Sequence, residues 1–312
     1  MVTSLEAVST YLPARQVPVD AYLRGYGLSE ARIKVHERYF GFSEIRLDPD
    51  TRLSEHLLSA VAGCDELPGL AHRVRYLLQA RTMPVAAPHP ENPLHDVRRR
   101  LGLDHAMAFC VTQHACASGL LAVDLAGKLL ACDGDPDARA LILMGEKAFT
   151  SCARVITDTG VMGEGTAAVL VSPGGGRDRV LGYATRTRGE FSGGAWLTPE
   201  ANALFHEIYP EALAEVMLAA VECAGLDLDD IALVLPHNVN RMSWLRVLKK
   251  LGLRGTGRLF LDNLPVTGHC FGADSFINYR SACDDGRLRP GDHYLMTAVG
   301  LGATFSAMVF QH

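Results

Sequence analysis

Charged and aromatic side chains are scarce in this sequence of 312 residues: 21% of the residues are charged and 7% are aromatic, with two tryptophans. The formal net charge is -5, and a chain without a basic excess does not fit a general nucleic-acid-binding protein. Because hydrophobic residues make up 48%, the chain can bury a sizeable core, and we expect one large or two moderate domains. This composition also excludes disordered, collagen-like and coiled-coil proteins.

No two of the eight cysteines have C-x-x-C spacing, so zinc-ribbon and thioredoxin-like sites lose their main signal. Most of these cysteines lie in apolar runs, where a free thiol behaves as a small buried hydrophobic group. We therefore expect free thiols in a reducing cytoplasm, and no metal site. Residues 1–20 lack the pattern of a signal peptide, and no run looks long and apolar enough to span a bilayer, so we expect no membrane contact.

Short apolar runs alternate with amphipathic stretches along the chain. The runs that we interpret as buried strands are residues 106–111, 140–144, 167–171, 231–235 and 294–299. One helical pattern begins near Ala117, and two more cover residues 210–224 and 242–251. Strands that alternate with helices predict an α/β protein with covered sheets.

A glycine-rich break divides the chain into two comparable halves, residues 1–173 and 177–312. Residues 172–179 read SPGGGRDR, in which three glycines follow a proline and precede charged residues. Each half has a helix-rich middle and a final run of strands. An internal duplication is therefore a hypothesis, although residue identity alone does not demonstrate it.

Cys116 is the strongest candidate for a nucleophile. It lies between the strand-like run 106–111 and a helical pattern, and the N-terminus of a helix lowers the pKa of a thiol. Small neighbours in the sequence ACASG leave room for a substrate. A buried, inert thiol is an equally good interpretation of this local pattern. A metal site built from Cys110, His114 and Cys116 matches no common zinc spacing.

Two histidines lie where a rigid scaffold could present catalytic groups. His237 directly follows the run IALVL and so stands at the end of a buried strand. His269 lies between Gly268 and Gly272, which permit unusual backbone angles and the close approach of a ligand. Asp274 follows five residues later and could orient the imidazole of His269. The alternatives are a polar residue that closes a strand and an ordinary glycine-rich turn.

The last of the four sites is the segment GLGAT at residues 300–304, which follows the final strand. Its backbone N–H groups could form half of an oxyanion hole, and a tight hairpin turn is the alternative. The four sites have the order and the intervals of the β-ketoacyl-acyl-carrier-protein synthase III branch of the thiolase superfamily. The chain resembles this branch over almost its full length.

Further motifs carry the same resemblance. Residues 163–168 (GEGTAA) look like the glycine-rich strand entry of the family, and residues 236–240 (PHNVN) are similar to its PHQAN motif, with LKKLGL following at residues 248–253. The resemblance implies a thiolase-like α/β fold, in which two similar halves stack as a five-layer α-β-α-β-α sandwich. It also implies a homodimer.

Carried over by motif, the resemblance implies that Cys116 is the nucleophile and that His237 is its partner at the thioester. It implies an oxyanion hole formed by the backbone N–H groups of Cys116 and Gly302. A thiolate that attacks a thioester carbonyl splits one hard transfer into two easier steps. The donor would be the phosphopantetheine thioester of an acyl-carrier protein or an acyl-coenzyme A, and no bound cofactor is expected.

One departure concerns the reaction. The synthase III branch normally has Asn where this chain has His269, whereas elongating synthases and thiolases have a His within G-H-x-x-G-A, which GHCFGA matches. With Asp274 following, the region resembles offshoots that transfer acyl groups to oxygen or nitrogen in specialised metabolism, and a His backed by Asp can act as general base on a hydroxyl or amine. We therefore expect an acyltransferase with a small-molecule acceptor.

Two alternatives stay open at this point. The first is a decarboxylative condensing enzyme that makes a β-ketoacyl product. The second is a non-catalytic thiolase-like scaffold that binds a carrier protein, against which the joint presence of Cys116, His237 and His269 argues.

Residues 238–261 contain no acidic side chain, although the whole chain is net negative. The segment holds Arg258 and five basic residues that we call the basic strip: Arg241, Arg246, Lys249, Lys250 and Arg254. Carrier proteins are acidic, so complementary charge would steer their docking here, and an ordinary solvated helix face is the alternative. Residues 31–47 also lack the Trp that the family uses against the adenine of coenzyme A, which favours a carrier protein as donor.

Overall fold

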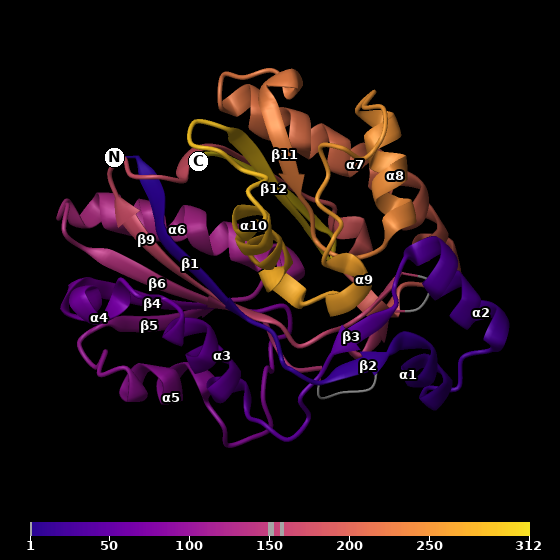
Figure 1. Cartoon of the computed structure of the whole chain (residues 1–312), viewed down its shortest axis with the longest axis horizontal. Helices are drawn as coiled ribbons and strands as arrows, with labels where there is room; N and C mark the ends of the chain where they lie inside the picture. Colours follow the sequence, from indigo (N-terminus) through magenta and orange to yellow (C-terminus); the bar gives the residue numbers. More distant parts are fainter. Residues whose placement is uncertain (1, 149–152, 157–158) are drawn as a thin grey trace.

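A computed structural model describes residues 2–148, 153–156 and 159–312, so Cys152 lies outside the described residues. Its centre is a mixed sheet of nine strands in the order β11-β12-β13-β10-β1-β9-β6-β4-β5 (Figure 1). The strands of this sheet are β1 (Thr3–Tyr11), β4 (Val74–Ala80), β5 (Met107–Val111), β6 (Arg139–Met144), β9 (Thr166–Pro173), β10 (Arg179–Thr187), β11 (Ile231–Leu235), β12 (His293–Gly300) and β13 (Thr304–Gln311).

Ten α-helices are present in the described residues. They are α1 (Val19–Gly25), α2 (Glu30–Val35), α3 (Leu53–Ala62), α4 (Leu67–Leu70), α5 (Pro93–Arg100), α6 (Ser118–Asp133), α7 (Pro199–Cys223), α8 (Arg241–Lys250), α9 (Leu264–Thr267) and α10 (Asp274–Asp284). Two small sheets complete the fold. They pair β2 (Gln16–Pro18) with β3 (Glu44–Arg46), and β7 (Val155–Ile156) with β8 (Gly160–Val161).

The two halves of the large sheet have the same strand order and directions. In the first half, β1 and β9 are antiparallel, β9 and β6 are antiparallel, and β6, β4 and β5 are parallel. In the second half, β10 and β13 are antiparallel, β13 and β12 are antiparallel, and β12 and β11 are parallel. Leu259 makes a single parallel bridge to Val234 of β11, at the position that β5 occupies in the first half. The arrangement has the symmetry of a duplication, whereas the division into domains 1–173 and 177–312 stays a prediction.

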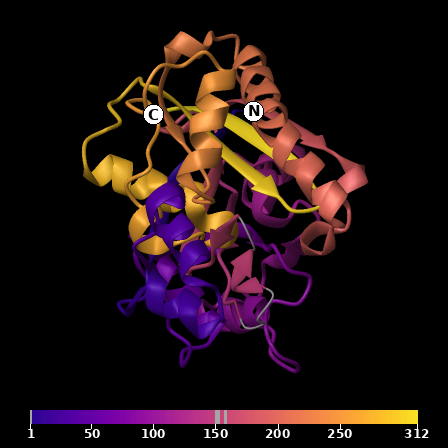
Figure 2. The same cartoon turned by 90° about the vertical axis from the view of Figure 1, so that its right-hand side faces the viewer.

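Three hydrophobic cores hold together five layers, which are three layers of helices and the two halves of the sheet between them. The central core packs α6 and α10 against both halves of the sheet, with Leu120, Phe276, Ile142 and Met296 fully buried. A second core lies under α7 and α8, and a third lies under α3 and α5. Figure 1 shows α10 between the two halves, and the turned view in Figure 2 shows α7 and α8 covering the outer side of the second half. The expected α-β-α-β-α sandwich is therefore confirmed.

All five predicted strands are present, each within two residues of its expected bounds. The prediction for α7 is wrong at its start: the helix begins at Pro199, where the side chain of Thr198 accepts a hydrogen bond from the backbone N–H of Ala201 at 3.3 Å. Proline is favourable in the first turn of a helix but costs about 3 kcal/mol in its interior. Pro210 nevertheless lies inside α7, because Tyr209 and Leu213 bury this face of the helix in the second core.

A second correction concerns the membrane. Residues Ala115–Asp133 form a helical segment that is long and apolar enough, by length and composition alone, to cross a bilayer. Half of this segment is buried inside the structure, as α6 between the two halves of the sheet. The apolar composition thus follows from the two sheet faces that α6 contacts, which is the common reason for such a helix in a globular core.

Candidate active site

The nucleophile candidate Cys116 lies in a tight turn, Ala115–Ala117, that leads directly into α6. Ala115 has a φ of 47°, in the left-handed region that non-glycine residues rarely adopt, and such backbone strain clusters at functional sites. The turn is wedged against the end of β12, since a Cβ on Gly300 would lie 1.9 Å from the carbonyl oxygen of His114. Only glycine at position 300 allows this approach. The thiol is 4% exposed.

His269 is the imidazole that contacts the sulfur. Its Nε2 lies 3.2 Å from Sγ of Cys116, and its Nδ1 forms a very short hydrogen bond with Oδ2 of Asp274. The same carboxylate accepts two backbone hydrogen bonds, each 2.6 Å long, from N–H of Asn238 to Oδ2 and from N–H of Cys270 to Oδ1. Sulfur, imidazole and carboxylate therefore form one buried line, in which Asp274 is fixed by three donors.

The electrostatics of this line favour a charged imidazole. Burial alone would lower the pKa of His269, but the charges of Asp274 and of the Cys116 sulfur outweigh burial and raise that pKa to about 10. An imidazolium beside a thiol stabilises the thiolate, which is the nucleophilic form. The geometry therefore places a charged imidazolium in contact with the sulfur.

His237 does not contact the sulfur. Its Nε2 lies 2.9 Å from the hydroxyl oxygen of Tyr209, and its ring centroid is 6.0 Å from that of His269. The indole N–H of Trp244 donates a hydrogen bond of 3.0 Å to the carbonyl of His237. Burial and the neighbouring His269 lower the pKa of His237 well below its usual value, against the opposing effect of the Thr297 carbonyl. His237 is therefore a neutral imidazole next to the charged imidazole of His269.

Gly302 lies in the turn between β12 and β13, beyond the Gly300 that touches the Cys116 turn. Its φ of 133° is one that side-chain-bearing residues rarely adopt. The close packing of Gly300 on His114 brings this turn next to the nucleophile. The oxyanion role of the Cys116 and Gly302 N–H groups stays a prediction.

Three residues near the nucleophile escaped the sequence analysis. Tyr209 partners His237, and the hydroxyl of Thr82 lies 3.4 Å from Sγ of Cys116. Glu146 is fully buried and accepts hydrogen bonds from the backbone N–H groups of Thr82 and Met83 at 3.0 and 3.3 Å. Burial raises the pKa of Glu146 to about 8, although these two N–H groups work in the opposite direction. Glu146 follows a predicted strand by two residues, the same signal that singled out His237.

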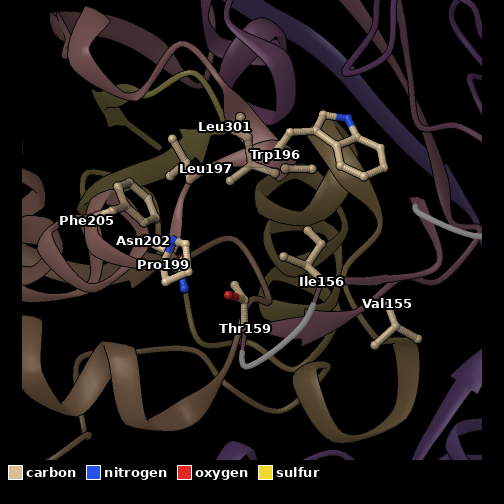
Figure 3. A pocket seen from close by; sticks show the side chains of 11 residues that line it. Val155, Ile156, Thr159, Trp196, Leu197, Pro199, Asn202, Phe205 and Leu301 are labelled. Carbon is tan, nitrogen blue, oxygen red and sulfur yellow. The ribbon is translucent and has the colours of Figure 1, made fainter. Parts of the chain in front are cut away.

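A cavity of about 30 Å³ adjoins the sulfur. Its lining includes Cys116, Tyr209, His237, Val239, His269 and Val299. A larger cavity of about 460 Å³ shares four lining residues with it, namely Ile156, Thr159, Phe205 and Leu301. Figure 3 shows these side chains around one hollow together with Trp196, which is 80% exposed. The two cavities are therefore neighbours, and these four residues lie between the reacting groups and the larger hollow.

The basic strip lies on α8 and in the loop that follows. Arg241, Arg246, Lys249, Lys250 and Arg254 are all exposed. Lys250 is ion-paired with Glu211 of α7. Arg258 is only half-buried and donates hydrogen bonds to the Leu228 carbonyl and the Asp229 carboxylate, so it belongs to the scaffold. The strip is thus an exposed cationic surface, and its role in docking stays a prediction.

Within the described ranges, no three His, Cys, Asp or Glu side chains gather as a metal-binding group. The alternative of a metal site from Cys110, His114 and Cys116 therefore has no geometric support. The exposed Cys110 lies on β5, whereas Cys116 contacts His269.

Comparison with known proteins gives consistent matches. Residues 221–312 match the family described as 3-oxoacyl-[acyl-carrier-protein] synthase III C terminal. The β-ketoacyl-[acyl-carrier-protein] synthase III of Rhizorhabdus wittichii is 28% identical over 69% of this chain and 70% of its own length. The 3-oxopimeloyl-[acyl-carrier-protein] synthase of Rhodothermus marinus is 28% identical over 97% of this chain and 92% of its own length.

Among solved structures, the acyltransferase ChlB3 superposes with a TM-score of 0.87 at 22% identity, covering 100% of this chain and 98% of that one. At such identity the likeness establishes the fold alone. Sequence matches, shared fold and the ordered motifs agree with one another. The chain is therefore similar in sequence to β-ketoacyl-acyl-carrier-protein synthase III over most of its length, and it has the thiolase-like fold of that branch.

Proposed function

We propose that this protein is an acyltransferase of specialised metabolism. It takes an acyl group from a carrier-protein or coenzyme A thioester onto Cys116 and passes it to a hydroxyl or amine. The observation that carries the proposal is the contact line from Sγ of Cys116 through His269 to Asp274. A histidine that is oriented by a carboxylate can accept a proton from an incoming hydroxyl or amine.

The first half-reaction acylates the thiol. The thiolate of Cys116 attacks the carbonyl carbon of the donor thioester. The N–H groups of Cys116 and Gly302 would stabilise the negative charge that develops on the carbonyl oxygen. The bond to the donor sulfur then breaks, and the departing thiolate takes the proton of the His269 imidazolium. Acyl-Cys116 and a neutral His269 are the products.

The second half-reaction uses the neutral His269 as base. Acylation removes the negative charge from the sulfur, which is one of the two charges that raise the pKa of His269. The pKa therefore falls, and the imidazole can accept the proton of the acceptor as its oxygen or nitrogen attacks the acyl carbon. The C–S bond breaks, and Asp274 stabilises the imidazolium until the thiolate re-forms.

Donor and acceptor would reach the sulfur through the larger cavity of about 460 Å³. This volume lies within the range of small-molecule sites. Trp196 and the apolar walls suit an apolar or aromatic group, and Thr159 and Asn202 offer polar contacts at the same wall. Acidic carrier proteins would dock on the basic strip, and complementary charge speeds such an encounter.

The second candidate function is decarboxylative condensation to a β-ketoacyl product. The names of the two curated relatives favour it, because both are acyl-carrier-protein synthases. A non-catalytic scaffold is the weakest alternative, since a scaffold has no need for a thiol held against an oriented imidazole.

The proposal includes a homodimer in the cytoplasm, built from two thiolase-like halves per chain. In the described part of the chain, β5 pairs along one edge only, with β4, and its residue Met107 is 63% exposed. An unpaired strand edge is a template for pairing with another chain. Pairing of β5 with its copy would extend the sheet across the dimer.

The test follows the acyl group through both half-reactions. The protein is incubated with a panel of acyl-carrier and coenzyme A thioesters, and intact mass reports the adduct, which Cys116→Ala should lack. The acyl enzyme is then mixed with malonyl carrier protein or with candidate alcohols and amines. Transfer to an alcohol or amine supports the proposal. Release of carbon dioxide with a β-ketoacyl product would replace it by the condensing function, and an adduct on Cys116→Ala would move the nucleophile elsewhere.

A further inference from the structure

Tyr209 has a hydroxyl group that the proposed mechanism does not use. This hydroxyl faces the cavity next to Cys116, which we call the reaction chamber. The residue projects from α7, is 7% exposed, and its hydroxyl oxygen lies 2.9 Å from Nε2 of His237. It lines the 30 Å³ cavity together with Cys116, His237 and His269. Tyr209 is therefore at the site of the reaction and touches one of its two imidazoles.

The ring of Tyr209 is held in place. Its centroid lies 5.7 Å from that of Phe205 and 5.8 Å from that of Phe305, both at edge-to-face angles. Such aromatic packing in a filled core limits the ring to one orientation. The hydroxyl cannot leave His237 without repacking this cluster. The contact with Nε2 is thus a fixed property of the chamber.

The hydrogen bond limits what His237 can do in either tautomer. If Nε2 carries no proton, it accepts from the Tyr209 hydroxyl and has nothing to donate. If Nε2 carries the proton, it donates to the Tyr209 oxygen. In both cases Nε2 of His237 has no free N–H to offer to an oxygen in the chamber.

Decarboxylation depends on that N–H. When a malonyl thioester loses carbon dioxide, the C–C bond to the carboxylate breaks and its electron pair becomes an enolate, whose charge rests on the thioester oxygen. Two donors must stabilise that oxygen before water protonates the carbon. In this chain His269 is bound to the sulfur and to Asp274, and His237 is bound to Tyr209.

We infer that Tyr209 is a specificity-determining residue, which commits the chamber to acyl transfer by occupying Nε2 of His237. This inference rests on the proposed transferase function and names the group that excludes the condensing reaction. It also predicts that loss of one hydroxyl group opens the decarboxylative chemistry.

The test compares the wild-type protein with Tyr209→Phe, which keeps the ring and removes the hydroxyl. Malonyl-N-acetylcysteamine is the probe, and its conversion to the acetyl thioester and carbon dioxide is followed by mass spectrometry. We expect the decarboxylation rate to rise at least tenfold in Tyr209→Phe and to return to the wild-type rate in Tyr209→Phe with His237→Ala. Acylation of Cys116 by a simple acyl thioester reports that the variant is folded.

Tyr183→Phe is the matched control, because it removes another tyrosine hydroxyl from β10, outside the chamber. It should leave the decarboxylation rate unchanged. An unchanged rate in a Tyr209→Phe variant that still acylates Cys116 overturns the inference and leaves the transferase proposal standing. Rapid decarboxylation by the wild-type protein overturns both. If Tyr209→Phe does not acylate Cys116, Tyr209→Leu replaces it in the same comparison, with the same outcomes.

Discussion

Replacing Asp274 by Asn gives a sharp test of the Cys116–His269–Asp274 line. Three N–H groups point at this carboxylate, from His269, Asn238 and Cys270. An amide has one acceptor oxygen and one NH₂ group, so it cannot accept from both sides. Either the NH₂ faces the N–H of Cys270, or it faces those of His269 and Asn238.

Each orientation has a defined cost. With the NH₂ toward Cys270, a buried backbone N–H loses its acceptor, which costs about 1–3 kcal/mol of stability. With the NH₂ toward His269, the imidazole must shift its proton to Nε2, and it can no longer accept a proton from Cys116 or from an acceptor. General acid–base catalysis contributes roughly 10²–10⁴-fold, so both half-reactions should slow by about this factor.

This expectation differs from the one that the sequence suggests. With Asp274 serving only the incoming acceptor, Cys116 acylation would survive the substitution. The structure places His269 on the sulfur as well, so both half-reactions depend on the same imidazole. A joint loss therefore follows from the catalytic line and does not by itself demonstrate a purely structural role for Asp274.

A pH profile separates the two explanations. Alkylation of Cys116 by iodoacetamide is measured from about pH 5 to about pH 9, with intact mass as the readout. The raised pKa of His269, about 10, keeps a charged imidazolium at the sulfur over this range, so the help that it gives to the thiolate should not change with pH in the wild-type protein. In Asp274→Asn the imidazole loses the charge that keeps it protonated, so the rate near neutrality should be lower and should depend more steeply on pH. Identical profiles, or acylation within about twofold of wild type, would refute the reasoning.

Two further predictions concern the surroundings of the site. Burial raises the pKa of Glu146 from 4.5 to about 8, so the folded protein holds this proton to higher pH than the unfolded chain does, and the free energy of unfolding falls as pH rises through that window. Between about pH 5 and about pH 8, the free energy of unfolding should fall less in Glu146→Gln than in the wild-type protein, by up to roughly 4 kcal/mol, as measured by urea denaturation. Parallel curves of this free energy against pH for the two proteins would contradict the buried-acid assignment. Arg246→Glu should slow acylation from a carrier-protein thioester severalfold at low salt, and the difference should shrink as salt screens the charge. The control is Arg75→Glu, which makes an equal charge change at an exposed position of β4 and should not slow this acylation. Equal losses with a small thioester mimic would mean that Arg246 supports the fold and not docking.

The sequence alone determined the local features of this protein. Alternating apolar runs and helical patterns located five strands of the large sheet and the helices α6, α7 and α8, because periodicity depends on neighbours a few residues away. Cys116 at a strand-to-helix junction and the ordered motifs were sufficient to indicate the resemblance to the synthase III branch. The start of α7 was missed, because Pro210 looks like a first-turn residue until the packing of Tyr209 and Leu213 is known.

Only the tertiary structure decided how the candidate groups meet. His269 lies 153 residues from Cys116 in the chain and yet contacts its sulfur, whereas His237, equally prominent in the sequence, contacts Tyr209. Tyr209 looks like an ordinary helix residue, and Thr82 and Glu146 look like ordinary loop residues. They reach the site because β4, β6, α7 and the Cys116 turn converge there. The repeated strand order of the two halves was equally hidden, since strand pairing joins residues far apart in the chain and leaves no periodic trace in it. Contacts between distant segments are set by the packing of the whole chain, and local sequence patterns cannot specify them.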